Sequence, residues 1–124
     1  MDHTVQLFDR PVRLVLTPSA ERAATERAAP LIAEMELLFS CMVAKRFHFH
    51  EAEPDAAAVA VSPMLHLAFR ATVASTCDVG EGKPLRHDST PLPDPRPYVP
   101  KWCRIDWANG SWHGEFGYDP ADQR

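Results

Sequence analysis

The sequence predicts an α+β domain in which one N-terminal helix packs on an antiparallel sheet of about five strands, in the order β-α-β-β-β-β. Three observations lead to this class. Apolar and polar residues alternate over residues 31–49 and 64–74, which is the period of strands with one buried face. An alanine-rich segment follows Thr17-Pro18. Near the C-terminus, an Asn-Gly dipeptide separates two alternating segments.

The bulk composition indicates one globular domain over residues 1–124. A chain of 124 residues forms one ordinary hydrophobic core, and 45% apolar with 24% charged residues is typical of such domains. With a net charge of -4, the chain lacks the basic surface that nucleic-acid binding usually needs, so we expect no nucleic-acid partner. Because no apolar stretch reaches the roughly 20 residues that span a bilayer and no secretory pattern opens the chain, we expect no membrane association and a cytoplasmic location.

The first predicted elements are a strand over residues 12–16 and a helix that begins after Thr17. Thr17 can accept a hydrogen bond from a free helical N–H, and Pro18 loses no hydrogen bond at the first helical position. Alanines at helical spacing give the helix a flat face for close packing. Pro30 should end the helix near Ala28.

The segment 31–49 has two interpretations. Nearly every odd position is apolar, with Lys45 as the exception, so we prefer one continuous strand. The alternative over residues 31–44 is a helix with Leu31, Met35, Leu38 and Met42 on one stripe, since Leu, Met and Glu favour helix.

The middle of the chain predicts two further strands and a long irregular segment. A turn around Pro54-Asp55 precedes strands over residues 59–61 and 64–74. Residues 76–100 hold six prolines and are expected to be irregular and largely extended. This segment is either a strap along the sheet edge or an arm that binds a partner.

The C-terminal hairpin is the clearest local prediction. Asn109-Gly110 favours a type I′ turn, which fixes the register of the two strands. On the apolar face, this register pairs Trp107 with Trp112, Ile105 with Gly114 and Cys103 with Phe116. On the other face, it pairs the opposite charges Asp106 with His113 and Arg104 with Glu115.

A candidate interaction surface follows from the proline-rich segment and from Trp102, which falls on the charged face of the hairpin opposite Gly117. Exposed aromatic residues are enriched at protein interfaces. The predicted surface consists of Pro93, Pro95, Pro97, Tyr98 and Trp102.

A candidate metal site consists of His48, His50 and His66. Residues two apart on a strand point the same way, so the imidazoles of His48 and His50 can converge on one transition-metal ion. If the hairpin pairs Phe49 with Leu65, His66 lies opposite His48. If it pairs Phe49 with Val59, His66 lies away from the site.

Catalytic residues are not recognised. Asp106 and His113 resemble half of a general-base arrangement but are more simply a surface charge pair. Cys77 is the cysteine expected to be exposed, and His87 lies in the same long loop. Three widely spaced cysteines argue against a disulfide framework and indicate reduced thiols, two of them in the core.

The function favoured by these patterns is a non-enzymatic protein-binding or accessory module, with a protein partner or a second copy of the chain as its ligand. The alternatives are a small metal-binding protein that uses the His-x-His pair and a small enzyme with a pocket between helix and sheet. No cofactor motif is found beyond the possible transition-metal site.

Overall fold

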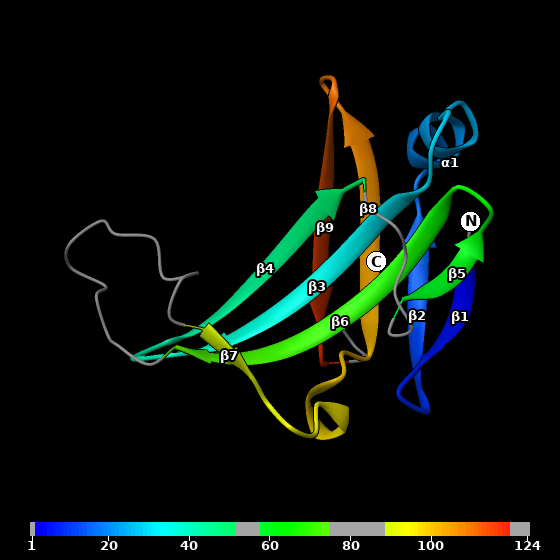
Figure 1. Cartoon of the computed structure of the whole chain (residues 1–124). Helices are drawn as coiled ribbons and strands as arrows, with labels where there is room; N and C mark the ends of the chain where they lie inside the picture. The colour runs from blue at the N-terminus through cyan, green and yellow to red at the C-terminus, as the bar shows by residue number, and fades with distance from the viewer. Residues whose placement is uncertain (1, 52–57, 75–88, 120–124) are drawn as a thin grey trace.

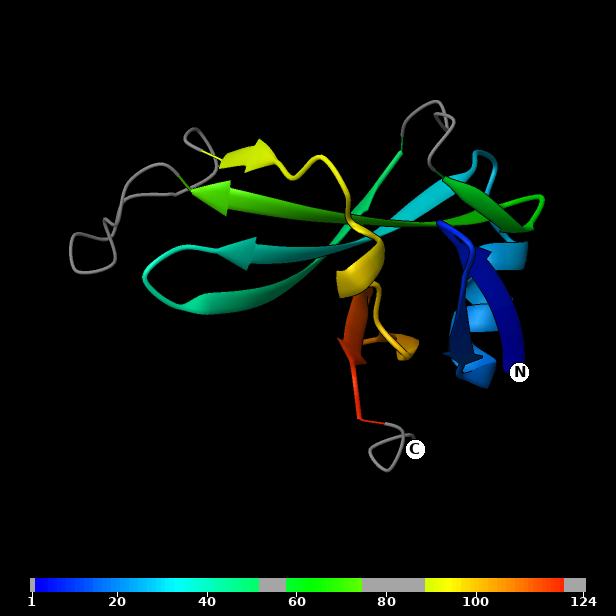
Figure 2. The ribbon, with the colours of Figure 1, turned by 90° about the horizontal axis from the view of Figure 1, so that it is seen from below.

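The computed structural model describes residues 2–51, 58–74 and 89–119, which form two β-sheets packed face to face. Sheet A has the strand order β1 (Asp2–Leu7), β2 (Arg10–Leu16), β8 (Trp102–Ala108) and β9 (Ser111–Gly117). Sheet B has the order β4 (Val43–His50), β3 (Leu31–Phe39), β6 (Leu65–Ala74) and β5 (Val59–Ser62), and β7 (Ser89–Pro91) also pairs with β6. The strands of the two sheets cross at a steep angle, and sheet B extends beyond sheet A at one end (Figures 1 and 2).

Both sheets are mixed, so the predicted antiparallel meander of about five strands is wrong. Strand β2 runs parallel to β8, and β3 runs parallel to β6. These parallel pairs join strands far apart in the sequence, whereas the prediction paired each strand with its neighbour along the chain. The coarse class, strands with one helix, is correct.

The helix α1 (Pro18–Thr25) begins where the sequence predicts and ends three residues before Ala28. Thr17 accepts a hydrogen bond from the Ala20 amide at 3.2 Å, and its hydroxyl donates to the Asp106 carboxylate at 2.6 Å. Ala20 and Ala24 are buried, so the alanine face packs as expected. The helix lies at one end of the two sheets (Figure 1). No helix in the described part of the chain is long and apolar enough to cross a membrane.

Residues 31–49 form a hairpin of two strands and not the single strand that we preferred. Strand is the correct conformation for β3, and the helical alternative is wrong. The turn contains three residues, 40–42, and Phe39 pairs with Val43. Because the pairing joins two odd-numbered residues, odd positions face the core in both strands, and the period of two continues through the turn without a break.

The β1–β2 hairpin is absent from the prediction. Its two-residue turn consists of Phe8 and Asp9, with φ angles of 51° and 64°. Positive φ at both central positions defines the same primed turn as Asn-Gly, but phenylalanine rarely adopts it. The residues at this turn therefore do not indicate it in the sequence.

The predicted C-terminal hairpin is confirmed, including every residue pair of its register. Asn109 and Gly110 have positive φ angles of 55° and 77°. The predicted ion pairs do not form between these described residues. Asp106 bonds Thr17, and His113 Nε2 lies 3.1 Å from the Ser111 hydroxyl and 3.2 Å from the Ala108 carbonyl.

Trp102 is buried, with 8% of its surface exposed, and the prediction that it is exposed is wrong. The register places it opposite Gly117 as expected. However, its ring lies directly against that glycine, where an added Cβ would approach within 2.6 Å. An aromatic ring over a strand glycine covers backbone that would otherwise be exposed.

The described proline-rich residues 89–100 form a strap, as one of the two interpretations has it. Strand β7 pairs with β6, and the Leu92 amide donates to the Ala71 carbonyl at 2.9 Å. A short 3-10 helix, η3 (Arg96–Tyr98), leads back to sheet A. Residues 76–88 lie outside the described residues.

The cysteines differ in state. Cys103 is a buried free thiol, and burial raises its pKa to about 12, as expected of a core residue. Cys41 is disulfide-bonded, so the prediction of reduced thiols is wrong at this position. Sequence spacing cannot reveal a bond between residues that only the fold brings together.

The two sheets meet along β4 and β9, where Phe47 packs on Gly114. A Cβ on Gly114 would lie 2.6 Å from the Phe47 ring, which no real side chain tolerates. Phe47 also stacks on Phe49 at 5.0 Å and packs edge-to-face on Phe116 at 6.2 Å. A glycine at this point thus lets the edges of the two sheets close together.

We predict that Gly114→Ala destabilises the protein by about 1–3 kcal/mol, the usual cost of overpacking. Without the Phe47 contact, alanine would be favoured over glycine in a strand. The free energy of unfolding from urea titrations measures the effect. In a Phe47→Leu background, the cost of Gly114→Ala should shrink or change sign. Equal costs in the two backgrounds would show that the contact does not constrain residue 114.

Candidate functional site

A polar pocket lies on the outer face of sheet B. Even-numbered residues of β3 and β4 point away from the core, and the parallel register aligns them with the even-numbered residues of β6. The hollow has a volume of about 770 Å³. The residues that line it are Glu34, Glu36, Leu38, Arg46, Phe47, His48, Phe49, His50 and Arg70.

Glu36 is the buried centre of this pocket, with 5% of its surface exposed. His48 Nε2 lies 2.8 Å from Oε1, and the Thr72 hydroxyl donates to Oε2 at 2.9 Å. Burying a carboxylate is costly unless its oxygens are hydrogen-bonded. These two contacts, one from each neighbouring strand, meet that requirement.

The pKa of Glu36 is lower than the usual value of a glutamate. Burial acts in the opposite direction and is the largest single influence, but the hydrogen bonds from His48 and Thr72 and the charge of Arg70 together outweigh it. Glu36 is therefore ionised at neutral pH. With Nε2 of His48 held by the carboxylate, Nδ1 of that ring remains available to a ligand.

The two arginines of the pocket differ in the contacts that their side chains make. Arg70 Nε lies 3.5 Å from Glu34 Oε1, and its Nη2 lies 3.7 Å from Glu36 Oε2. Both separations exceed the length of an ordinary hydrogen bond. Among the described residues, the Arg46 and His50 side chains make no hydrogen bond or ion pair.

The structure brings together only part of the predicted metal site. His48 and His50 lie on the same face of β4, as expected. Strand β3 separates β4 from β6, so neither proposed hairpin register is correct. His66 lies in the row of His50, two strands or about 10 Å away, and His48 lies two residues further along β4. No group of three metal-ligating side chains is found within the described ranges, and metal binding by these histidines stays a prediction.

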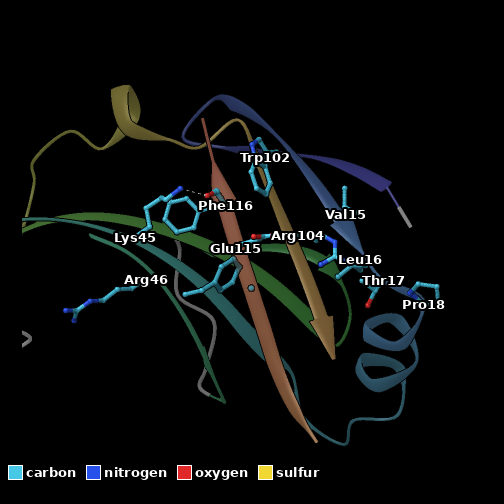
Figure 3. A pocket seen from close by; sticks show the side chains of 12 residues that line it. Val15, Leu16, Thr17, Pro18, Lys45, Arg46, Trp102, Arg104, Glu115 and Phe116 are labelled. Carbon is cyan, nitrogen blue, oxygen red and sulfur yellow. Dashed lines mark hydrogen bonds between the residues drawn. The ribbon is translucent and has the colours of Figure 1, made fainter. Parts of the chain in front are cut away.

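A second hollow, of about 1090 Å³, lies along β9 (Figure 3). Trp102, Arg104 and Glu115 line it on one side of the strand, while the Lys45 ammonium donates to the Phe116 carbonyl at 3.1 Å on the other. Arg46 extends away from β9 (Figure 3). Arg46 thus lines both this hollow and the polar pocket on sheet B.

The predicted carboxylate–imidazole pair on the C-terminal hairpin does not exist as a contact. The Asp106 carboxylate accepts its hydrogen bond from Thr17, which is the main reason that its pKa is lowered. His113 is exposed and contacts Ser111. Cys77 and His87 lie outside the described residues.

A distal apolar surface occupies the end of sheet B that extends beyond sheet A. Val43, Phe39 and Val73 lie side by side on three neighbouring strands. The Tyr98 ring packs edge-to-face on Phe39 at 5.1 Å. With Met42 in the β3–β4 turn, these five residues define the surface. Pro93 and Pro97 are exposed, and Pro95 is half-buried, in the neighbouring strap.

Sequence reasoning missed Glu36, Thr72 and Arg70 as site residues. Glu36 lies in an otherwise apolar segment, which is a weak sign of a buried carboxylate. Thr72 and Arg70 gave no sign at all, because their partners come from a strand more than 30 residues away in the chain.

Comparisons with known proteins give no relative from which a function could be transferred. No protein-family model, curated protein or solved structure matches this chain.

We predict that the Glu36 carboxylate makes stability fall on acidification. A folded-state pKa below the unfolded value of about 4.5 adds stability that is complete above pH 4.5 and is lost as the pH falls through the lower folded-state value. At neutral pH, Glu36→Gln should cost about 1–3 kcal/mol, because two charge-assisted hydrogen bonds are weakened. Urea titrations from about pH 3 to about pH 7, a range that includes the usual pKa of a glutamate, measure both effects.

The matched control is Glu115→Gln, which removes an exposed carboxylate from β9. This variant should keep the wild-type pH profile. If Glu36→Gln kept that profile too, the carboxylate would not be ionised and bonded in the folded state.

Proposed function

We propose that this chain is a non-enzymatic protein-binding module and that the distal apolar surface is its docking surface. The partner presents an apolar, uncharged contact surface. One observation carries the proposal, namely where the exposed large hydrophobic side chains lie.

All four exposed large hydrophobic residues in the described part of the chain belong to this one surface. The exposed fractions are 64% for Met42, 61% for Val43, 38% for Val73 and 37% for Tyr98. Scattered single hydrophobic residues are normal on a soluble protein, but a gathered patch is typical of an interaction site. Their gathering supports docking of another protein.

The surface is held in place before any partner arrives. The Tyr118 hydroxyl donates to the Tyr98 carbonyl at 2.7 Å, which anchors the strap. Phe39 packs against the Tyr98 ring, and the Ser40 hydroxyl donates to the Met42 carbonyl at 2.9 Å within the β3–β4 turn. A pre-ordered surface loses little conformational entropy on binding.

We predict that a photo-crosslinking amino acid, p-benzoylphenylalanine, at position 42 captures a discrete partner in cells of the native host. The same amino acid at Ser62, an exposed position on β5, is the matched control and should give no such adduct. Mass spectrometry of the adduct then distinguishes a second copy of the chain from a different protein.

A second substitution links the adduct to the apolar surface. Val43→Lys should abolish capture at position 42, while Ser62→Lys should leave it unchanged. Because both side chains are exposed, the free energy of unfolding should change by less than about 0.5 kcal/mol. The proposal fails if position 42 gives no discrete adduct, or if the adduct survives Val43→Lys.

A further inference from the structure

We infer that the polar pocket on sheet B binds the carboxylate or phosphate group of a small organic anion between Arg46 and Arg70. The inference is independent of the distal apolar surface. It rests on which polar groups of the pocket have protein partners and which do not.

The acidic groups of the pocket are already engaged. Both oxygens of Glu36 accept hydrogen bonds, one from His48 and one from Thr72. A cation entering the pocket would have to compete with these buried contacts. Glu36 therefore serves as a support beneath the pocket and not as a ligand for a cation.

The polar groups of the pocket that lack a close hydrogen-bond or ion-pair partner are hydrogen-bond donors. Arg46 makes no ion pair within the described residues, and Arg70 meets the two carboxylates only at 3.5 and 3.7 Å. The Arg70 side chain is 47% exposed, so part of it is accessible to a ligand. His50 adds a further free imidazole at the rim.

The two guanidinium groups are placed to share one anion. Arg46 and Arg70 are the register partners of Glu36 on either side, so the three residues form one row across β4, β3 and β6. Strands two apart lie about 10 Å from each other. Two arginine side chains can close that distance above Glu36, and each presents the planar fork that matches carboxylate and phosphate oxygens.

The rest of the pocket suits an organic body attached to the anionic group. The rings of Phe47 and Phe49 pack toward sheet A, on Phe116 and Trp112, so the outer-face lining of the pocket comes from the even-numbered side chains. Leu38 on β3 is buried, so the accessible lining is mainly polar. The volume of about 770 Å³ lies in the range of small-molecule sites. The pocket therefore has room for an organic body beside the anionic group.

The test is an NMR titration of the full-length protein with benzoate, phenyl phosphate and inorganic phosphate as separate probes. Shifts of the β3, β4 and β6 amide signals should saturate with benzoate or phenyl phosphate, and the comparison of these two probes identifies the preferred anion. Inorganic phosphate should shift the same amide signals, because the two guanidinium groups recognise the anionic group and not the body attached to it.

Three arginine variants distinguish a specific binding site from a general effect of charge. Arg46→Gln and Arg70→Gln should each weaken binding about tenfold or more, and Arg46→Lys should give an intermediate loss because it keeps the charge without the fork. Arg22→Gln, an exposed cation on α1, is the matched control and should change affinity less than about twofold.

Two outcomes would overturn the inference. One is the absence of saturable shifts with every probe. The other is an equal loss of affinity in Arg22→Gln and Arg46→Gln, which would indicate attraction by overall charge. Val43→Lys should leave probe binding unchanged, so this inference and the docking proposal can fail separately.

Discussion

Strand β3 lies between antiparallel β4 and parallel β6, and both candidate surfaces depend on that placement. The pairing aligns three strands so that their residues form rows across sheet B. One row on the outer face sets Glu36 between two arginines. One row on the inner face sets Phe39 between two valines. Without the parallel β3–β6 pairing, neither the polar pocket nor the distal apolar surface would exist.

The two faces of sheet B meet different physical demands. On the inner face, apolar side chains are buried against sheet A until sheet A ends, and the remaining apolar residues are left in contact with water. On the outer face, a buried carboxylate needs a hydrogen bond from each neighbouring strand. The first demand leaves an apolar surface exposed where sheet A ends. The second fixes the side chains beneath a pocket rich in unengaged donors.

Local signals predicted local structure well. Thr17-Pro18 marks the start of α1, and Asn109-Gly110 fixes the whole register of the C-terminal hairpin, because turn geometry acts within a few residues. Signals failed where residues broke the usual preferences or where the pattern was ambiguous. Phe8-Asp9 forms a primed turn without glycine, and the turn at 40–42 preserves the alternation of the strands around it.

The sequence by itself determined that the described residues form strands together with a helix, that odd positions of residues 31–49 face the core, and that His48 and His50 share a face. Alternation and turn residues encode these properties locally. Only the tertiary structure decided which strands are neighbours. That choice buried Glu36 with Thr72, separated His48 from His66 and covered Trp102, because contacts between distant segments depend on how whole sheets pack and not on any local pattern.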